Sequence, residues 1–464
     1  MATRTEQVMA AIRGRIDRRV LTPGARLPSI RAMASTMGVA ASTVVEAYDR
    51  LAAEGAIRAR QGSGFYVTAP LAPLAICDDA VVPEREIDPV WMLRQSLQSH
   101  PGAALPGCGW LPPEWMAEQT LRKGLRRLAR EASTPALVGY LAEERATQLR
   151  QLIARRLFEQ GVEAGTDQVL LVDSATHAID LALRLLVEPG QTVLVDDPGY
   201  FNFHALLRAH RVRVVGVPVT RDGPDLDAFA AAVAAHRPRL YLTNSGLQNP
   251  TGVSLSLGSA RRILRIAAEH DMAIIEDDIY ADFEHAPSPR LAALDGLDRV
   301  IRVSSFSKTL TAAARCGYIV ARHDWIAALS DLRIATGMTT SMLSLELVLH
   351  ALTDGSYRRH VERLRVRLGQ AMAQALPRLE ALGITPFVEP AAGMFLWCRL
   401  PDGFDAVALA RSALAANIVL APGPVFSPIC AAREHLRINV AMLDERVYQW
   451  FDQAFARGPN APAG

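Results

Sequence analysis

Lysine is rare in this chain, and one of its two lysines lies in a segment suited to amine chemistry. The 464 residues carry fifty basic side chains, of which only Lys123 and Lys308 are lysines. A desolvated lysine amine can lose its proton and attack a carbonyl, whereas an arginine guanidinium stays protonated and forms no imine. Lys308 lies in VSSFSKTLTAAARCGYIV, seven residues before Arg315. We interpret Lys308 as a candidate imine-forming lysine; the alternative is a residual surface charge in an arginine-biased chain.

Other polar and aromatic side chains follow apolar stretches of the chain, where a bound ligand could meet them. NPTG (residues 249–252) follows RLYLT, and Asp277 and Tyr280 leave the apolar stretch MAIIEDD. A carboxylate there could keep a ring nitrogen protonated, because a nearby anion favours the cationic form. Tyr200, after a Pro-Gly turn, could stack on a flat ring, and Arg437 could clamp a carboxylate bidentately. Each segment also has a structural interpretation: a turn, a solvated strand end, a helix anchor and an interdomain salt bridge, respectively.

These segments follow predicted strands of a single sheet. From about residue 165, apolar strands such as QVLLV, TVLVDD, RLYLT, MAIIEDD and RVIRVSS alternate with helical segments such as ATHAIDLALRLL and SARRILRIAAEH. Such alternation predicts a largely parallel sheet flanked by helices, and ligands of open sheets gather at strand ends. Beyond about residue 340, helices mix with short strands such as MFLWCRL and HLRINVA, which predicts a smaller α+β domain.

The beginning of the chain is basic and has a different pattern. Residues 1–70 carry ten arginines against five acids, whereas the whole chain has a formal net charge of +2. An amphipathic helix is predicted over 5–19, short helices over 29–37 and 42–54, and two short strands in AIRARQGSGFYVT around a Gly-Ser-Gly turn. This order predicts a winged helix-turn-helix, and the local charge favours binding to a polyanion.

Composition excludes several other classes of protein. The five cysteines form no CxxC pair and show no metal-ligand spacing, which fits a reducing compartment and predicts no metal site. We see no signal-peptide pattern and no apolar run of membrane-spanning length. We therefore expect a soluble, cytoplasmic protein with no membrane partner.

Taken together, the segments around Lys308 resemble the fold-type I pyridoxal 5'-phosphate (PLP) enzymes of the class I/II aminotransferase family, over roughly residues 100–455. The resemblance implies an α/β PLP-dependent transferase fold of type I, with PLP as the cofactor. It implies that Lys308 is the Schiff-base lysine and general base, and that Asp277 pairs with the pyridine nitrogen. Tyr280 and Asn249 would hydrogen-bond the 3′-oxygen of the ring.

The same resemblance assigns the rest of the site. Tyr200 would stack on the ring, and Arg437 would hold the α-carboxylate of a substrate. Tyr140 resembles a tyrosine that reaches the phosphate of the partner subunit, which implies a homodimer. Four residues would bind the phosphate, two of them at the start of a helix: Ser305, Arg315, Ser174 and Ala175.

The helix start departs from the family's pattern. Ser174 and Ala175 stand where the family usually has a glycine and a hydroxyl donor, and Asp173 adds a negative charge. We therefore expect a weaker phosphate contact here, with the identity of the cofactor unchanged.

Residues 5–68 closely resemble the GntR family of bacterial winged-helix DNA-binding domains. By that resemblance, residues 42–50 begin the recognition helix, which would lie in the major groove. Nine residues would contact phosphates, base edges or the minor groove: Ser29, Arg31, Ser42, Thr43, Tyr48, Arg60, Gly62, Ser63 and Gly64. Ala41 stands where the family often has an arginine, so a common guanine-reading contact is missing. A winged helix used only for protein contacts is the alternative.

A GntR-type head joined to an aminotransferase-like body is the arrangement of the MocR-type regulators. We expect a DNA-binding domain in residues 1–70, a linker in 71–90 and a PLP-binding part in 91–464, with a large part at about 100–340 and a small part at about 341–455. The expected function is PLP-dependent transcription regulation at double-stranded operator DNA, in response to an amino compound or to PLP. Two alternatives stay open: an active amino-acid aminotransferase with an accessory DNA-binding head, and a lyase or decarboxylase on the same scaffold. Turnover stays undecided, because sensing and catalysis use the same lysine.

Overall fold

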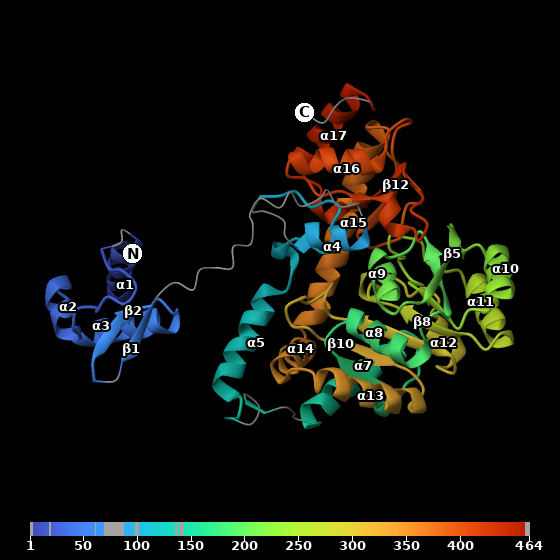
Figure 1. Cartoon of the computed structure of the whole chain (residues 1–464). Helices are drawn as coiled ribbons and strands as arrows, with labels where there is room; N and C mark the ends of the chain where they lie inside the picture. Colours follow the sequence, from blue (N-terminus) through green and yellow to red (C-terminus); the bar gives the residue numbers. More distant parts are fainter. Residues whose placement is uncertain are drawn as a thin grey trace. The chain divides into compact units, whose positions relative to one another are not determined.

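The chain folds into two compact units, Met1–Arg85 and Glu86–Gly464 (Figure 1). The computed structural model describes residues 3–17, 20–60, 62–68, 88–97, 102–134, 138–139 and 143–459. Most of the expected linker, residues 71–90, lies outside the described residues. Its last residues are described, and helix α4 (Pro89–Leu97) already begins there.

The N-terminal unit is the predicted winged helix-turn-helix. It consists of α1 (Arg4–Asp17), α2 (Ile30–Met37), α3 (Ala41–Ala53) and the antiparallel strands β1 (Ile57–Arg60) and β2 (Gly64–Val67). Ser29 caps α2 by accepting a hydrogen bond of 3.2 Å from the Ala32 N–H, and Gly38 ends α2 in the left-handed conformation that glycine adopts without strain. The apolar faces of the three helices and the hairpin share one core, which includes Val8, Ile12, Met33, Val44, Tyr48, Leu51 and Ile57.

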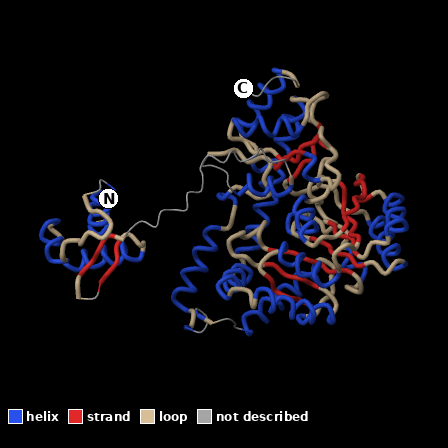
Figure 2. The backbone as a smooth tube through the Cα atoms, viewed as in Figure 1, coloured by secondary structure: helices blue, strands red, loops and turns tan. Residues whose placement is uncertain are grey.

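The second unit is built on a large sheet, drawn in red in Figure 2. Its eight strands have the order β3-β10-β9-β8-β7-β4-β5-β6. The strands are β3 (Val169–Val172), β4 (Thr192–Asp197), β5 (Arg213–Thr220), β6 (Gly223–Pro224), β7 (Leu240–Thr243), β8 (Ala273–Asp277), β9 (Val300–Ser305) and β10 (Gly317–Val320). Neighbours from β9 through β8, β7 and β4 to β5 pair in parallel, while β10 runs antiparallel to both of its neighbours. The predicted, largely parallel sheet is confirmed.

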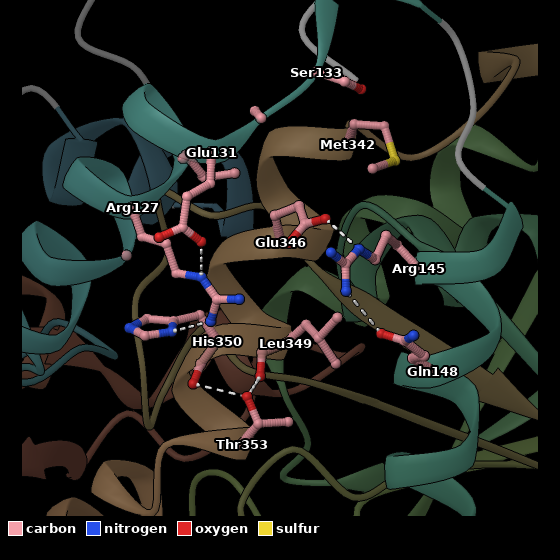
Figure 3. A pocket seen from close by; sticks show the side chains of 13 residues that line it. Arg127, Glu131, Ser133, Arg145, Gln148, Met342, Glu346, Leu349, His350 and Thr353 are labelled. Carbon is pink, nitrogen blue, oxygen red and sulfur yellow. Dashed lines mark hydrogen bonds and ion pairs between the residues drawn. The ribbon is translucent and has the colours of Figure 1, made fainter. Parts of the chain in front are cut away.

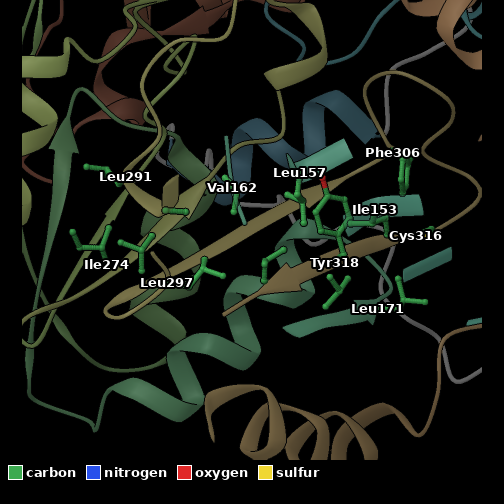
Figure 4. Packing of buried hydrophobic residues seen from close by; sticks show 14 of the residues in the cluster. Ile153, Leu157, Val162, Leu171, Ile274, Leu291, Leu297, Phe306, Cys316 and Tyr318 are labelled. Atoms are coloured by element: carbon green, nitrogen blue, oxygen red, sulfur yellow. The ribbon is translucent and has the colours of Figure 1, made fainter. Parts of the chain in front are cut away.

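Helices cover both faces of this sheet, because its buried strands are apolar on both sides. They are α7 (Glu143–Glu159), α8 (Ala175–Leu186), α9 (Phe201–Ala209), α10 (Leu226–His236), α11 (Leu257–Glu269), α12 (Leu291–Asp295) and α13 (His323–Gly337). Outside this layer, α14 (Met342–Thr353) packs on α7, and α5 (Glu118–Glu131) packs on α14. On one face Leu171 and Ile274 pack with Ile153 and Leu157 of α7 (Figure 4). On the other face Leu170, Val193 and Ile275 pack with α8. This alternation follows from the two-residue period of a strand.

A smaller part completes the second unit. It contains the long helix α15 (Ser356–Ala381), α16 (Ala406–Ala415), α17 (Glu445–Arg457) and a four-stranded antiparallel sheet with the order β11-β12-β14-β13. The strands are β11 (Thr385–Pro386), β12 (Phe395–Arg399), β13 (Ala421–Pro422) and β14 (His435–Asn439). The α+β character agrees with the prediction. However, α14 packs into the core of the large part through Met342, Leu345 and Val348, so the boundary lies within α15 and not near residue 341.

Two features are not found among the described residues. No helix among them is long and apolar enough to cross a membrane. They likewise contain no group of three or more His, Cys, Asp or Glu side chains that could hold a metal ion.

Candidate active site and nucleic-acid interface

Lys308 lies just after the end of β9, in the connection that leads to β10. Its Nζ atom donates a hydrogen bond of 2.5 Å to the carbonyl oxygen of Gly109. Burial lowers the pKa of the Lys308 amine to about 8, and the nearby Arg437 guanidinium acts in the same direction. A measurable fraction of this amine is therefore neutral at physiological pH, which is the form that attacks a carbonyl.

Asp277 is the last residue of β8, the strand next to β9, and its side chain is buried. Burial raises the pKa of its carboxyl to about 7. The Ile279 N–H donates to its Oδ1 atom at 3.2 Å, and the Asn244 amide donates to its backbone carbonyl at 2.9 Å. A carboxyl group with a pKa of about 7 is readily ionised when a cationic group lies against it. The position therefore suits a protonated ring nitrogen.

Asn249, Tyr280 and Arg437 form a chain of hydrogen bonds across the two parts of the second unit. The Asn249 Nδ2 atom donates to the Tyr280 hydroxyl at 3.3 Å, and Arg437 Nη1 donates to Asn249 Oδ1 at 2.9 Å. All three side chains are buried, and Asn249 follows β7 whereas Arg437 lies in β14. These hydrogen bonds therefore join the end of the large sheet to the smaller part of the second unit.

Arg437 is held in an aromatic box that leaves part of its guanidinium without a partner. Its Cζ atom lies 4.4 Å from the ring centre of Phe395 and 5.0 Å from that of Phe426. Its Nη2 atom donates to the Gly107 carbonyl at 2.6 Å. Among the described residues its buried Nε atom has no hydrogen-bond partner. A buried, partly unsatisfied guanidinium suits an incoming carboxylate.

Tyr200 stands at the start of α9, close enough to Asp277 and Arg437 for both charges to affect it. Burial raises the pKa of its hydroxyl to about 12, Arg437 opposes the rise and Asp277 adds to it. Its ring contacts Phe201 and Phe203, with centroid distances of 5.0 and 5.2 Å. The structure therefore brings Tyr200 to the same place as the other predicted ring contacts.

The predicted phosphate residues are only partly assembled. Ser305 ends β9 and is buried, and Ser174 caps α8 by accepting a hydrogen bond of 3.0 Å from the His177 N–H. A Cβ atom on Gly317 would lie 2.8 Å from the Ser174 carbonyl carbon and 3.0 Å from the Ala175 nitrogen, so the start of α8 packs tightly on β10.

Two other predicted phosphate contacts are not placed at this point. Arg315 is exposed, with a positive φ of 44°. Tyr140 lies outside the described residues. The phosphate role of both residues stays a prediction.

Residues 107–109 were missed by the sequence analysis, although they form one wall of the site. The Gly107 and Gly109 carbonyls accept from Arg437 and Lys308, and Asn439 Nδ2 donates to the Cys108 carbonyl at 2.9 Å. A Cβ atom on Gly107 would lie 2.5 Å from the Ala421 nitrogen, so only glycine fits there. Two glycines around a cysteine, in PGCGW, were the available signal.

A buried ion cluster behind Asp277 was also missed. Asp278 accepts from Arg290 Nε at 3.0 Å and from Arg302 Nη2, and Arg290 Nη2 donates to Glu284 at 2.6 Å. Although burial opposes ionisation, these two arginines hold the pKa of Asp278 below its usual range. The fixed negative charge on Asp278 adds to the rise of the Asp277 pKa. Arg302, inside an otherwise apolar strand, was the signal in the sequence.

A hollow of about 480 Å³ lies elsewhere, between α5, α7 and α14 (Figure 3). Its charged side chains pair with one another: Arg127 with Glu131 at 2.8 Å, and Arg145 with Glu346 at 2.9 Å. Among the described residues that line it, none was predicted to bind the cofactor. We therefore do not assign the candidate site to this hollow.

The N-terminal unit presents most of the predicted DNA contacts on its surface. Ser29, Arg31, Ser42, Arg60, Gly62 and Gly64 are exposed, and Thr43 and Ser63 are half-buried. The Arg60 guanidinium lies 4.7 Å from the ring centre of Tyr66, which holds it along the hairpin. The start of α3 and the hairpin thus offer polar and basic groups to a ligand.

Tyr48 is a correction to the predicted set. Its side chain is fully buried, and its hydroxyl donates a hydrogen bond of 2.8 Å to the Pro28 carbonyl. It also packs edge-on against Phe65, with the ring centres 5.0 Å apart. Tyr48 therefore holds α3 against the turn before α2 and is withdrawn from the DNA contacts.

Comparison with known proteins identifies both units. Residues 112–451 match the family model for aminotransferase class I and II, and residues 4–67 match that for bacterial regulatory proteins of the gntR family. The chain is 30% identical to the probable rhizopine catabolism regulatory protein MocR of Rhizobium meliloti, over 90% of this chain and 85% of that protein. The chain belongs to the class I and II aminotransferase family and is a MocR-type protein.

One further relative matches almost the whole of this MocR-type chain, and two others match a smaller share of it. It is 29% identical to the HTH-type transcriptional regulator YdcR of Escherichia coli, over 96% of this chain and 95% of that protein. It is 31% identical to a 2-aminoadipate transaminase of Thermus thermophilus, over 75% of this chain and 88% of the enzyme. The crystal structure of LysN, an α-aminoadipate aminotransferase of the same organism complexed with N-(5'-phosphopyridoxyl)-L-leucine, superposes with a TM-score of 0.70 and 29% identity, over 79% of this chain and 95% of LysN. The type I fold expected from the sequence is thus confirmed.

Proposed function

We propose that this MocR-type chain is a PLP-dependent, DNA-binding transcription regulator that senses an amino compound through its aminotransferase-like part. One observation carries the proposal. A gntR-type winged helix and a half-buried lysine, close enough to the buried carboxylate of Asp277 to feel its charge, occur in the same chain. An enzyme alone has no need of a DNA reader, and a DNA reader alone has no need of a desolvated lysine. A cytoplasmic location follows from the DNA partner.

The residues present fit PLP, which when bound supplies a ring that stabilises a carbanion at the substrate's α-carbon. Lys308 would hold it covalently through Nζ, and Asp277 would pair with the pyridine nitrogen. The raised pKa of Asp277 supports this role, because a buried carboxyl near neutrality gains most from a cationic partner. Asn249 and Tyr280, already hydrogen-bonded to each other, would face the ring oxygen.

The phosphate group and a partner subunit complete the proposed site. Ser305, Ser174 and Ala175 lie at a strand end and a helix start, where backbone N–H groups favour an anion. Arg315 would turn toward the phosphate from its exposed position. Tyr140 would come from a second copy of the chain, so we propose a homodimer.

The amino ligand would be an amino acid. The unsatisfied Nε atom of Arg437 and its aromatic surroundings favour a carboxylate held without competing water. Lys308 would take or return a proton at the α-carbon, since its pKa of about 8 lets it act as base and acid near neutrality.

An aminotransferase with an accessory DNA-binding head is the second candidate function. It is favoured by the presence of Lys308 and Asp277 together with the hydrogen-bonded Asn249, Tyr280 and Arg437, and by the likeness to a 2-aminoadipate transaminase.

The two functions separate in one experiment on the full chain. A duplex is first recovered from a random-sequence DNA library, and its affinity is measured with PLP and with each amino acid in turn. A regulator shows a changed DNA affinity with at least one amino acid and no more than about one keto acid per site. Keto acid formed over many cycles, with DNA affinity unchanged, would contradict the proposal and support the enzyme.

A further inference from the structure

At the start of α3, the exposed side chains of Ala41, Ser42 and Val45 present methyl groups and one hydroxyl. Ala41 and Ser42 are exposed, and Val45, one turn further on, is 40% exposed. Val44 and Ala47, between and behind them, are fully buried in the core of the N-terminal unit. The side of α3 that is free to meet a partner therefore begins with small apolar groups.

Two charged side chains further along α3, Glu46 and Arg50, are paired with each other. Arg50, the only basic residue of the helix, donates from Nη2 to Glu46 Oε1 at 2.5 Å. Glu46 also accepts a bond of 3.5 Å from the Thr5 hydroxyl on α1. Neither charge lies in the first turn, and each already has a partner within the unit.

Exposed arginines lie outside α3, on other elements of the same N-terminal unit. Arg26 and Arg31 are exposed just before and at the start of α2, and Arg58 and Arg60 are exposed on β1. Arginines in such places neutralise phosphates, which fixes a helix on the duplex without reading its sequence. Recognition of the bases would then depend on the side chains at the start of α3.

Guanine and thymine need different groups from a protein. Guanine is read in the major groove by a bidentate arginine or lysine at O6 and N7, and the exposed start of α3 has neither. The thymine C5-methyl group is read by apolar contact with side chains such as alanine. The methyl groups of Ala41 and Val45 can make that contact, and the Ser42 hydroxyl can hydrogen-bond an adjacent base edge.

The spacing limits where the thymines lie. Residues four apart on a helix have Cβ atoms about 5–6 Å apart. Successive bases on one strand rise by about 3.4 Å. We infer that Ala41 and Val45 read the methyl groups of two thymines, on either strand, that lie one to two base steps apart. This inference rests on the proposed DNA-binding function and adds the base preference of its site.

Replacing thymine by deoxyuridine tests the inference, because it removes only the methyl group. The full chain selects a duplex from a random-sequence library, and each thymine of that duplex is then replaced in turn. We expect two replacements one to two steps apart to weaken binding by about fourfold each, the value of one buried methyl group. The remaining replacements serve as controls and should leave the affinity unchanged.

Two variants place the contacts on the protein. Val45→Ala should abolish the effect of deoxyuridine at one of the two positions and keep it at the other. Ala41→Arg should change the selected base at its own position from A·T to G·C, a gain that a misfolded protein does not produce.

The outcomes distinguish the inference from the function beneath it. A selected duplex that tolerates deoxyuridine at every position, or an Ala41→Arg variant that selects the same duplex as the wild type, would overturn methyl reading while DNA binding stands. A library from which no duplex is enriched would overturn both.

Discussion

Arg437 Nη1 donates a hydrogen bond of 2.9 Å to Asn249 Oδ1, across 188 residues of chain. The bond joins β14 of the smaller part to the segment that follows β7 of the large sheet. In the proposed function Arg437 binds the carboxylate of the ligand and Asn249 the oxygen of the PLP ring. In that function, ligand binding would therefore be coupled to the relative position of the two parts through one pair of side chains.

Replacing Lys308 by alanine should remove covalent capture of PLP and leave the fold intact. We expect the full chain to gain visible absorbance on mixing with PLP and the Lys308→Ala variant to gain none that survives gel filtration. Lys123→Ala is the matched control, because Lys123 is the other lysine and its exposed side chain pairs only loosely with Asp354, at 3.4 Å. Equal retained absorbance in Lys308→Ala would remove Lys308 from the site.

Replacing Asp277 by asparagine should stabilise the cofactor-free protein at neutral and higher pH. The folded-state pKa of Asp277, about 7, lies above its ordinary value of 3.8, so its ionisation costs stability as pH rises from about 4 to 7. Asparagine avoids this cost. The advantage of Asp277→Asn in the free energy of unfolding should grow by about 2–3 kcal/mol between pH 5 and pH 8.

Denaturant unfolding at the two pH values measures this difference. Saturating PLP should reverse the order at pH 8, because the ionised Asp277 then has a cationic partner that asparagine cannot replace. An advantage that is the same at pH 5 and pH 8 would mean that Asp277 does not titrate in this range.

Arg437→Lys should reduce discrimination between an amino acid and the amine that lacks its carboxylate. Lysine keeps the charge but cannot bind a carboxylate through two parallel hydrogen bonds. We expect the affinity ratio of the two ligands, measured by the change in PLP absorbance, to fall by about tenfold to a hundredfold. An unchanged ratio, together with equal loss for both ligands, would indicate a purely structural role for Arg437.

The meeting of the main site residues follows from the pattern of the sequence. Asn249 follows β7, Asp277 ends β8 and Lys308 follows β9, and because these neighbouring strands are parallel, all three residues come to the same end of the strands. Strand alternation alone predicts that juxtaposition. The part played by residues 107–109 could not be predicted, since their carbonyls meet Lys308 and Arg437 only after contacts across 199 and 330 residues have formed.

For Tyr48 the sequence pattern indicates a buried side chain, which the structure has, whereas the family resemblance implies a DNA contact. Val44, Ala47, Tyr48 and Leu51 follow the spacing of one buried helix face, and all four are buried. Neither the sequence pattern nor the family resemblance predicts the exposed position of Arg315. Its exposed position depends on a left-handed backbone turn just before β10.

Arg31→Ala should weaken DNA binding and reduce its dependence on salt. Arg31 is exposed in the first turn of α2, where a phosphate contact is proposed. Loss of one phosphate contact should reduce the slope of log affinity against log salt concentration by about 1, without changing the selected sequence. Arg457→Ala, an exposed arginine at the end of α17, should leave the slope unchanged. A lower affinity with an unchanged slope would argue against a phosphate contact at Arg31.

Tyr48→Phe should loosen the N-terminal unit and leave its DNA contacts in place. The substitution removes only the hydroxyl that donates to the Pro28 carbonyl, a bond of the kind that contributes about 1 kcal/mol. Amide hydrogens of α3 should therefore exchange about fivefold faster, as measured by mass spectrometry on the full chain, while peptides from the second unit exchange at the wild-type rate. If Tyr48 contacted DNA instead, the affinity for the selected duplex would fall by about the same factor and the exchange of α3 would not change. We expect the first result, because a fully buried hydroxyl with a satisfied partner cannot reach a phosphate without opening the core.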